Sequence, residues 1–247
     1  MDAAAFRPLL ESIVVALILV LLLIALAGLA AWTMPRWLVP RLAARSPRCL
    51  YSVPVIERVV ALTLDDGPDS EHNLELLDLL RAHGARATFF LLADHINGRE
   101  ALVSAIVAGG HELGNHLMRD EPSVRMSPAE FEHAVRQADV ALRQFASVRW
   151  LRPGSGWYTE RMLDTMASAG YRCALGSVYP LDPHVPWPRV TAAYVLANTV
   201  PGAVIVLHEG GERGRRTIRI LARVLPSLRA WGYRVVTLSE LERQRQV

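Results

Sequence analysis

The stretch Ala61-Leu62-Thr63-Leu64-Asp65-Asp66-Gly67-Pro68 is the feature from which the rest of the chain can be interpreted. It completes an apolar run that begins at Val59 and has the length and β-branched content of a buried strand. Gly-Pro breaks the strand, so two adjacent carboxylates are delivered to the edge of a core. Adjacent carboxylates repel unless a cation lies close by, and a metal ion is the usual one. On this stretch alone, a plain Asp-Asp-Gly-Pro turn is the alternative.

A second feature is an apolar segment near the start of the 247-residue chain. From Ile13 to Trp32 it carries no charge, and a helix of this length is about 30 Å long, the thickness of a bilayer core. The segment predicts one N-terminal transmembrane helix, with residues 1–35 as a membrane anchor and residues 36–54 as a linker. A cleavable signal peptide and a buried soluble helix are the alternatives.

Basic residues flank this segment unevenly. Arg7 precedes it, whereas Arg36, Arg41, Arg45 and Arg48 follow it. The positive-inside tendency would keep the following part cytoplasmic, although long domains are translocated despite such charges. The rule does not decide the side. We predict a single-pass membrane protein whose folded part lies outside the cytoplasm, with the cytoplasmic face as the alternative.

The overall charge does not indicate a nucleic-acid partner. The net charge is +3, all 27 basic residues are Arg, and no basic run alternates with aromatic residues. The two cysteines, Cys49 and Cys173, form no CxxC metal pattern, and their pairing does not follow from the sequence. The oligomeric state does not follow from the sequence either.

Strand and helix patterns alternate through the remainder of the chain. Such alternation predicts an α/β fold with a parallel sheet, either a closed barrel or a doubly wound sheet. In both architectures, active groups gather at the C-terminal ends of the strands. The predicted strands cover about 59–64, 87–92, 112–114, 148–151, 172–176, 203–207 and 234–237. Asp65, Asp66, His116, Arg152 and His208 all follow such strands closely.

His116 and Asp120 are four residues apart, which is one turn if the segment is helical. Together with Asp66 they would form a set of oxygen and imidazole ligands. Such a set suits Zn²⁺ and is also acceptable to Co²⁺ or Mn²⁺. A surface or capping pair is the alternative for His116 and Asp120.

Four segments resemble, in order and in approximate spacing, the motifs of the polysaccharide deacetylases, carbohydrate esterases with a NodB-like domain. The segments are Thr63-Leu64-Asp65-Asp66-Gly67-Pro68, Gly114-Asn115-His116, Arg152-Pro153-Gly154-Ser155-Gly156 and Ile205-Val206-Leu207-His208. The resemblance spans nearly all of the chain after the linker and implies a catalytic domain over residues 55–243. It also implies a distorted (β/α) barrel and a bound divalent metal, usually zinc.

The resemblance implies roles for the charged residues. Asp65 resembles the general base, and Arg152 the arginine that holds it. Asp66 and His116 resemble metal ligands, whereas the family's second histidine ligand is replaced by Asp120. His208 resembles the general acid that protonates the leaving amine, with a core-satisfied histidine as the alternative. Asp182 occupies the position of the aspartate that tunes this histidine.

Three further residues are implied to bind substrate. The backbone N–H of Ser155 would stabilise the oxyanion, and Leu207 would line the acetyl pocket. Trp157, with its neighbour Tyr158, would form a wall on which a sugar stacks, although core packing is the alternative for one of the two.

The sequence therefore predicts a hydrolase that removes N-acetyl groups from amino-sugar glycans such as chitooligosaccharide or peptidoglycan, with a divalent metal as cofactor. One alternative is a deformylase or deacylase of lipid-linked sugars at the membrane. The other is a degenerate, membrane-tethered glycan-binding protein, because Asp120 replaces a histidine ligand.

Overall fold

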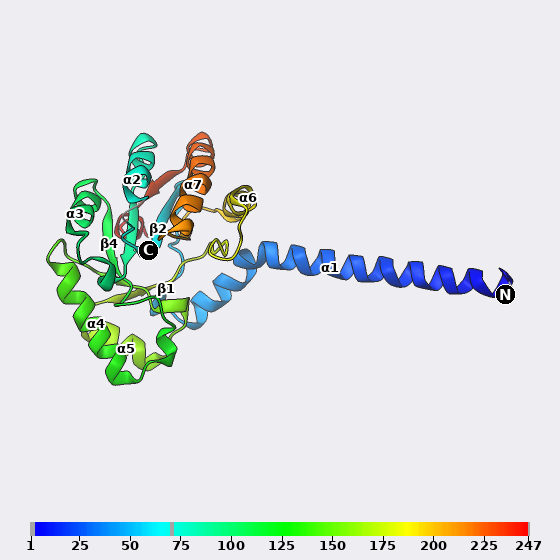
Figure 1. Ribbon diagram of the computed structural model, residues 1–247, viewed down its shortest axis with the longest axis horizontal. Coiled ribbons are helices and arrows are strands. Elements are labelled where there is room, and N and C mark those ends of the chain that lie inside the picture. Colours follow the sequence, from blue (N-terminus) through cyan, green and yellow to red (C-terminus); the bar gives the residue numbers. More distant parts are fainter. Residues whose placement is uncertain (1–2, 70–71, 247) are drawn as a thin grey trace.

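The structure is a computed structural model that describes residues 3–69 and 72–246 (Figure 1). The first two residues of the predicted anchor therefore lie outside the described residues. The helical elements are α1 Ala3–Arg45, α2 Asn73–Ala82, η1 Ala93–His95, α3 Glu100–Ala108, η2 Ser123–Arg125, α4 Pro128–Arg143, η3 Gly154–Gly156, α5 Glu160–Ser168, α6 Pro188–Asn198, α7 Glu212–Ala230 and α8 Leu238–Glu242. The strands are β1 Cys49–Leu50, β2 Val59–Gly67, β3 Ala87–Leu91, β4 Glu112–Asn115, β5 Trp150–Leu151, β6 Arg172–Ala174, β7 Val204–His208 and β8 Arg234–Val236.

The strands form one parallel sheet in the order β1-β6-β5-β4-β3-β2-β7, with β8 paired to the beginning of β2. The two edges of this sheet approach each other. Val178, which follows β6, forms a parallel bridge to Ile205 of β7, and Ser52, which follows β1, forms an antiparallel bridge to Ala203. Isolated bridges, rather than a regular ladder, thus complete the ring. The predicted α/β fold with a distorted barrel is confirmed.

Strand β2 pairs with three other strands. Each of its residues is buried, and it pairs with β3 on one side and with β7 and β8 on the other. The strand continues past Leu64 because Asp65 keeps its place in the ladder, opposite Phe90 of β3 and His208 of β7. The predicted carboxylate pair therefore lies at the C-terminal end of a fully buried strand.

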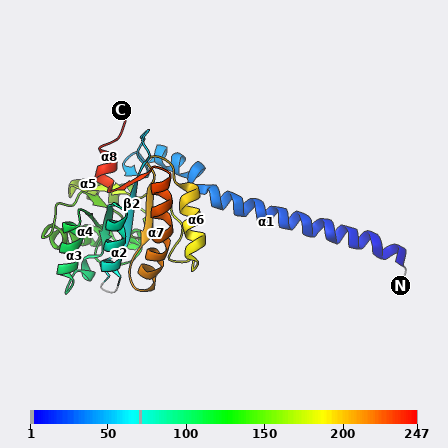
Figure 2. The same ribbon diagram turned by 90° about the horizontal axis from the view of Figure 1, so that it is seen from above.

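The helices lie around the outside of the sheet, and α4 shows how the sequence fixes their starts (Figures 1 and 2). Ser127, the N-cap, accepts a hydrogen bond from the Glu130 backbone N–H, and the Glu130 side chain accepts one from the Ser127 N–H. This reciprocal capping box fixes the first turn of α4.

Helix α1 projects away from the remainder of the molecule, with the N-terminus at its far end (Figures 1 and 2). Ile13–Arg45 is the one span in the described residues that is long and apolar enough to cross a membrane. A signal sequence near an N-terminus has the same properties. The apolar side chains from 13 to 31 are exposed, as expected of a segment that leaves the folded domain.

The C-terminal part of α1 packs on the domain. The Asn198 side chain donates a hydrogen bond of 3.0 Å to the Trp32 carbonyl, and the rings of Trp32 and Tyr194 meet edge to face at 5.3 Å. Arg36 donates to the Ala197 carbonyl, and Val39 is buried in the main core. Residues 36–54, predicted as a linker, therefore contain the docked end of α1 and strand β1. The docking of this end is explained by the apolar positions at Pro35, Val39 and Leu42, which recur at helical spacing.

Candidate active site

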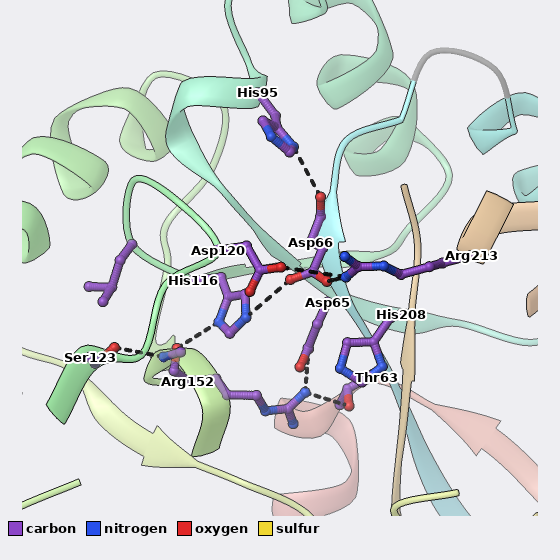
Figure 3. A network of polar contacts seen from close by, with 12 residues as sticks. Thr63, Asp65, Asp66, His95, His116, Asp120, Ser123, Arg152, His208 and Arg213 are labelled. Atoms are coloured by element: carbon purple, nitrogen blue, oxygen red, sulfur yellow. Dashed lines mark hydrogen bonds and ion pairs between the residues drawn. The ribbon is translucent and has the colours of Figure 1, made fainter. Parts of the chain in front are cut away.

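The polar side chains at the C-terminal ends of β2, β4, β5 and β7 meet at one end of the barrel (Figure 3). The parallel register explains this convergence, because Asp65 is level with His208, and Asn115 is level with both Leu91 and Leu151. The loops that follow these strands therefore begin at the same level along the barrel, and their side chains can meet.

Backbone strain is also concentrated here. Four non-glycine residues in the described chain have positive φ angles, namely Asp66, Leu117, Ser155 and Leu181. Each one is a predicted site residue or the neighbour of one. Such conformations are costly and persist where the surrounding structure demands a particular side-chain direction.

Asp65 is held by a buried arginine. Arg152 donates from Nη1 to Asp65 Oδ1 at 2.5 Å and to Thr63 Oγ1 at 2.9 Å, and from Nε to the Ala174 carbonyl at 3.0 Å. Its guanidinium also lies over the Phe90 ring, 4.1 Å from the centroid. Arg152 is 2% exposed, so these contacts fix the direction of the Asp65 carboxylate.

Asp66 and His116 face each other across the site. His116 Nε2 lies 3.5 Å from Asp66 Oδ1, and His116 Nδ1 donates to the Arg152 carbonyl at 2.7 Å. Because a carbonyl only accepts, Nδ1 carries a proton and Nε2 is the nitrogen that faces Asp66. Burial alone would raise the pKa of Asp66, but the hydrogen bond and charge of His116, with His208 and Arg213, outweigh it and lower that pKa.

Asp120 reaches the same cluster through Arg213, a residue that the motifs did not indicate. Arg213 Nη1 donates to Asp66 Oδ2 at 2.6 Å and lies 3.5 Å from Asp120 Oδ2 (Figure 3). The Asp120 side chain is 51% exposed, whereas that of Asp66 is 7% exposed. Asp120 therefore belongs to the rim of the site.

His208 is paired with Asp182. Its Nδ1 lies 3.0 Å from Asp182 Oδ1, and its backbone N–H donates to Asp182 Oδ2 at 2.9 Å. Burial alone would lower the pKa of His208, but the hydrogen bond and charge of Asp182, together with Asp65 and Asp66, raise it to about 9. The imidazole is thus protonated at neutral pH and can give up a proton.

Glu209 and Asn73 form a second buried contact behind Asp66 that the sequence did not indicate. The Asn73 amide donates to Glu209 Oε2 at 2.5 Å. Burial raises the pKa of Glu209 to about 8, so its carboxyl is protonated at neutral pH. The Glu209 side chain also lies where a Cβ on Gly67 would be, 1.7 Å from Oε1, which explains why residue 67 is a glycine.

A cavity of about 470 Å³ opens above these groups. Asp65, Asp66, His116, Asp120, Arg152, Asp182, His208 and Arg213 line it, together with Pro153, Ser155, Gly156, Tyr179, Pro180, Leu181, Pro183, His184 and Val206. The cavity thus combines carboxylates, imidazoles and guanidinium groups with an apolar wall.

Comparisons with known proteins agree with this geometry. The family described as Polysaccharide deacetylase matches residues 52–174. A peptidoglycan-N-acetylglucosamine deacetylase of Bacillus cereus is 33% identical over 198 residues, which cover 79% of this chain and 93% of the relative. The chain belongs to the polysaccharide deacetylase family. A chitooligosaccharide deacetylase of Bradyrhizobium sp. is 33% identical over 198 residues, covering 74% of this chain and 90% of that one. Among solved polysaccharide deacetylase structures, that of the Bc1960 peptidoglycan N-acetylglucosamine deacetylase has a TM-score of 0.75 at 28% identity, covering 83% of this chain and 98% of that chain.

The predicted metal ligands of this polysaccharide deacetylase are only partly assembled. The described residues contain no group of three or more His, Cys, Asp and Glu side chains positioned to hold a metal ion. His116 is oriented by the Arg152 carbonyl, as metal-binding histidines are by a second hydrogen bond, and it faces Asp66. These two side chains fit a divalent metal in chemistry and direction, and Asp120 is separated from Asp66 by the Arg213 guanidinium.

The predicted substrate-binding residues of this family member differ in their placement. Ser155 lines the cavity, but Leu207 is fully buried in the main core, and Val206 lines the cavity instead. Side chains alternate along a strand, so 206 and 208 share a face that 207 does not. Leu207 therefore points away from the cavity, and its role in an acetyl pocket stays a prediction.

The two aromatic residues after Ser155 lie apart. Trp157 is 70% exposed and is not among the described residues that line the cavity, so its sugar-stacking role stays a prediction. Tyr158 packs against the core, and its hydroxyl lies 3.0 Å from that of Tyr51. Tyr158 is therefore the one of the two aromatic residues that packs in the core.

Proposed function

We propose that the chain hydrolyses N-acetyl groups of amino-sugar glycans of the chitooligosaccharide or peptidoglycan type. The observation that carries the proposal is that one cavity contains a carboxylate held by a buried arginine, Asp65, and an imidazole held by a buried carboxylate, His208. The names of the curated relatives support the substrate class.

Asp65 is the general base in this proposal. It takes a proton from the water that attacks the acetamide carbonyl carbon, and Arg152 keeps its carboxylate pointed into the cavity. The backbone N–H of Ser155, at the cavity wall, is the proposed donor to the developing oxyanion.

His208 is the general acid. As the carbon–nitrogen bond breaks, it gives its proton to the sugar nitrogen, and acetate and the free amine leave. Asp182 stabilises the imidazolium, which is why the group is protonated before the reaction begins.

A divalent metal, with zinc as the first choice and cobalt or manganese as the others, is the proposed cofactor. Asp66, His116 and Asp120 would hold it, and it would act as a Lewis acid toward the acetamide carbonyl. The orientation of His116 toward Asp66 supports this assignment.

The proposed location is a membrane, through α1 as a single-pass anchor, with the folded part outside the cytoplasm. The length and apolar composition of α1 support this. A site on the cytoplasmic face, with lipid-linked sugars as substrates, stays the alternative, as does the glycan-binding role.

The substitution D65N tests the proposal. Because an asparagine side chain cannot accept the proton, we expect acetate release from acetylated chitooligosaccharide to fall by about 10²- to 10⁴-fold, while bound metal measured by elemental analysis stays equal to that of the wild type. Full activity of D65N would show that Asp65 is not the base. Thermal unfolding serves as the control, because the change leaves the Arg152 charge buried without its partner.

A further inference from the structure

Arg213 contacts two of the three residues that are proposed to bind the metal. A single atom, Nη1, donates to Asp66 Oδ2 at 2.6 Å and lies 3.5 Å from Asp120 Oδ2. It therefore joins a carboxylate at the end of β2 to a carboxylate in the loop after β4 (Figure 3). A metal ion bound by both carboxylates would be a second cation between Asp66 and Asp120, in the place that the guanidinium occupies.

The fold directs Arg213 to this position. Helix α7 begins at Glu212, directly after Gly210 and Gly211, whose φ angles of 102° and 53° suit glycine. The Gly211 backbone N–H donates to Asp69 Oδ2 at 3.1 Å and so ties the loop to the segment after β2. Arg213 thus lies in the first turn of a long packed helix, which fixes the position of its backbone beside the site.

The guanidinium can nevertheless leave. The Arg213 side chain is 39% exposed, whereas that of Arg152, which holds Asp65, is 2% exposed. Rotation of the Arg213 side chain into solvent would therefore leave the packing of α7 intact.

Two cations compete for one pair of carboxylates. A charge-assisted hydrogen bond to a buried carboxylate is strong, and it occupies Asp66 Oδ2, while Asp66 Oδ1 faces His116. A divalent ion placed between Asp66 and Asp120 would lie within a few ångströms of the guanidinium, where like charges repel strongly.

We propose that Arg213 is a built-in competitor of the divalent metal ion. Its guanidinium holds Asp66 and Asp120, and it must move away before both can bind one ion, so Arg213 sets the metal affinity. The inference rests on the proposed function, because it requires a metal at Asp66, His116 and Asp120.

The test is a titration of the chelator-treated full chain, in detergent micelles, with Zn²⁺ by calorimetry. We expect R213Q, which removes the charge and keeps a polar side chain, to lower the Kd for Zn²⁺ at least tenfold, about 1.4 kcal/mol. R213K keeps a positive charge and should stay within about threefold of the wild type, given that a lysine ammonium is a similar point charge. A titration with Co²⁺, followed by the absorption of the bound ion, is a second readout and should rank the variants by affinity in the same order.

The matched control is R219Q on the exposed face of the same helix, which loses the same charge away from the site and should leave the Kd unchanged. R213M replaces R213Q if thermal unfolding shows that the latter does not fold. An R213Q that binds Zn²⁺ no more tightly than the wild type, or more weakly, would overturn the proposal.

Failure of this inference is distinguishable from failure of the proposed function. If the wild type binds metal and releases acetate but R213Q has the same Kd, only the role of Arg213 is wrong. If neither protein binds Zn²⁺, Co²⁺ or Mn²⁺ and the wild type releases no acetate, the proposed function and the competitor role are both wrong.

Discussion

At the scale of single residues, the site contains two ion pairs. In one, a buried arginine holds a carboxylate, and in the other, a buried carboxylate holds a histidine. Arg152 fixes the carboxylate of Asp65, the proposed proton acceptor, and Asp182 fixes the imidazole of His208, the proposed proton donor. Each partner is almost completely buried, at 2% exposure, so its charge is only weakly screened by solvent. These environments support the proposed direction of proton transfer, from water to Asp65 and from His208 to the amine.

The substitution D182N tests the role of this environment through pH. His208 has a pKa of about 9, raised from 6.5, so it is protonated below this value and loses its proton as the pH rises through it. The neutral amide of the D182N side chain could not stabilise the imidazolium, and we expect the alkaline limb of kcat/KM to move at least about one pH unit lower. The measurement is a pH profile with acetylated chitooligosaccharide, and an unmoved alkaline limb would assign the acid role to another group.

The same pair affects stability. Because the folded-state pKa of His208 is raised, its ionisation stabilises the fold fully below pH 6.5, and this contribution is lost as the pH rises through about 9. In D182N, the melting temperature should therefore depend less on pH between these values than in the wild type.

At the scale of elements, the sequence predicted most strands well because β2, β3 and β7 are short apolar runs, of which β2 and β7 end at polar residues, and the other predicted strands alternate with helices between them. Strand β1 could not be predicted this way. It has two residues, and it exists through its register with β6, in which Cys49 is opposite Cys173. No local pattern indicates such a distant partner. The contact of Arg213 with Asp66 could not be predicted locally either, because it depends on where α7 begins relative to β2. Leu207 is different, since the alternation of side chains along β7 already indicated that 206 and 208 share the site face.

The docked end of α1 and strand β1 are expected to matter for stability. A chain that begins at Val53 lacks Val39, Leu50 and Tyr51, which are all buried, whereas a chain that begins at Thr33 keeps them. Burial of an apolar side chain contributes about 1.5–3 kcal/mol, so we expect the shorter chain to melt at least about 10 °C lower. Differential scanning calorimetry of the two chains measures this, and equal melting temperatures would show that residues 33–52 add no stability to the domain.

At the scale of the whole molecule, α1 connects an apolar segment directly to the catalytic barrel. The helix is continuous from Ala3 to Arg45, and Trp32 and Arg36 contact α6, so no flexible tether separates the two parts. If α1 spans a membrane, the barrel is held close to its surface, and the glycans within reach are those near that surface.

The membrane anchor leads to a prediction that separates it from a signal sequence. A retained α1 keeps the full chain in the membrane fraction after carbonate washing, because a span of this length and hydropathy leaves the bilayer only in detergent. A chain that begins at Thr33 should then be found in the soluble fraction with its deacetylase activity intact. Mass spectrometry of the intact protein from both the membrane and the soluble fractions completes the test, since an N-terminus beyond Trp32 would show that the segment is cleaved as a signal sequence and that the barrel is not anchored by it.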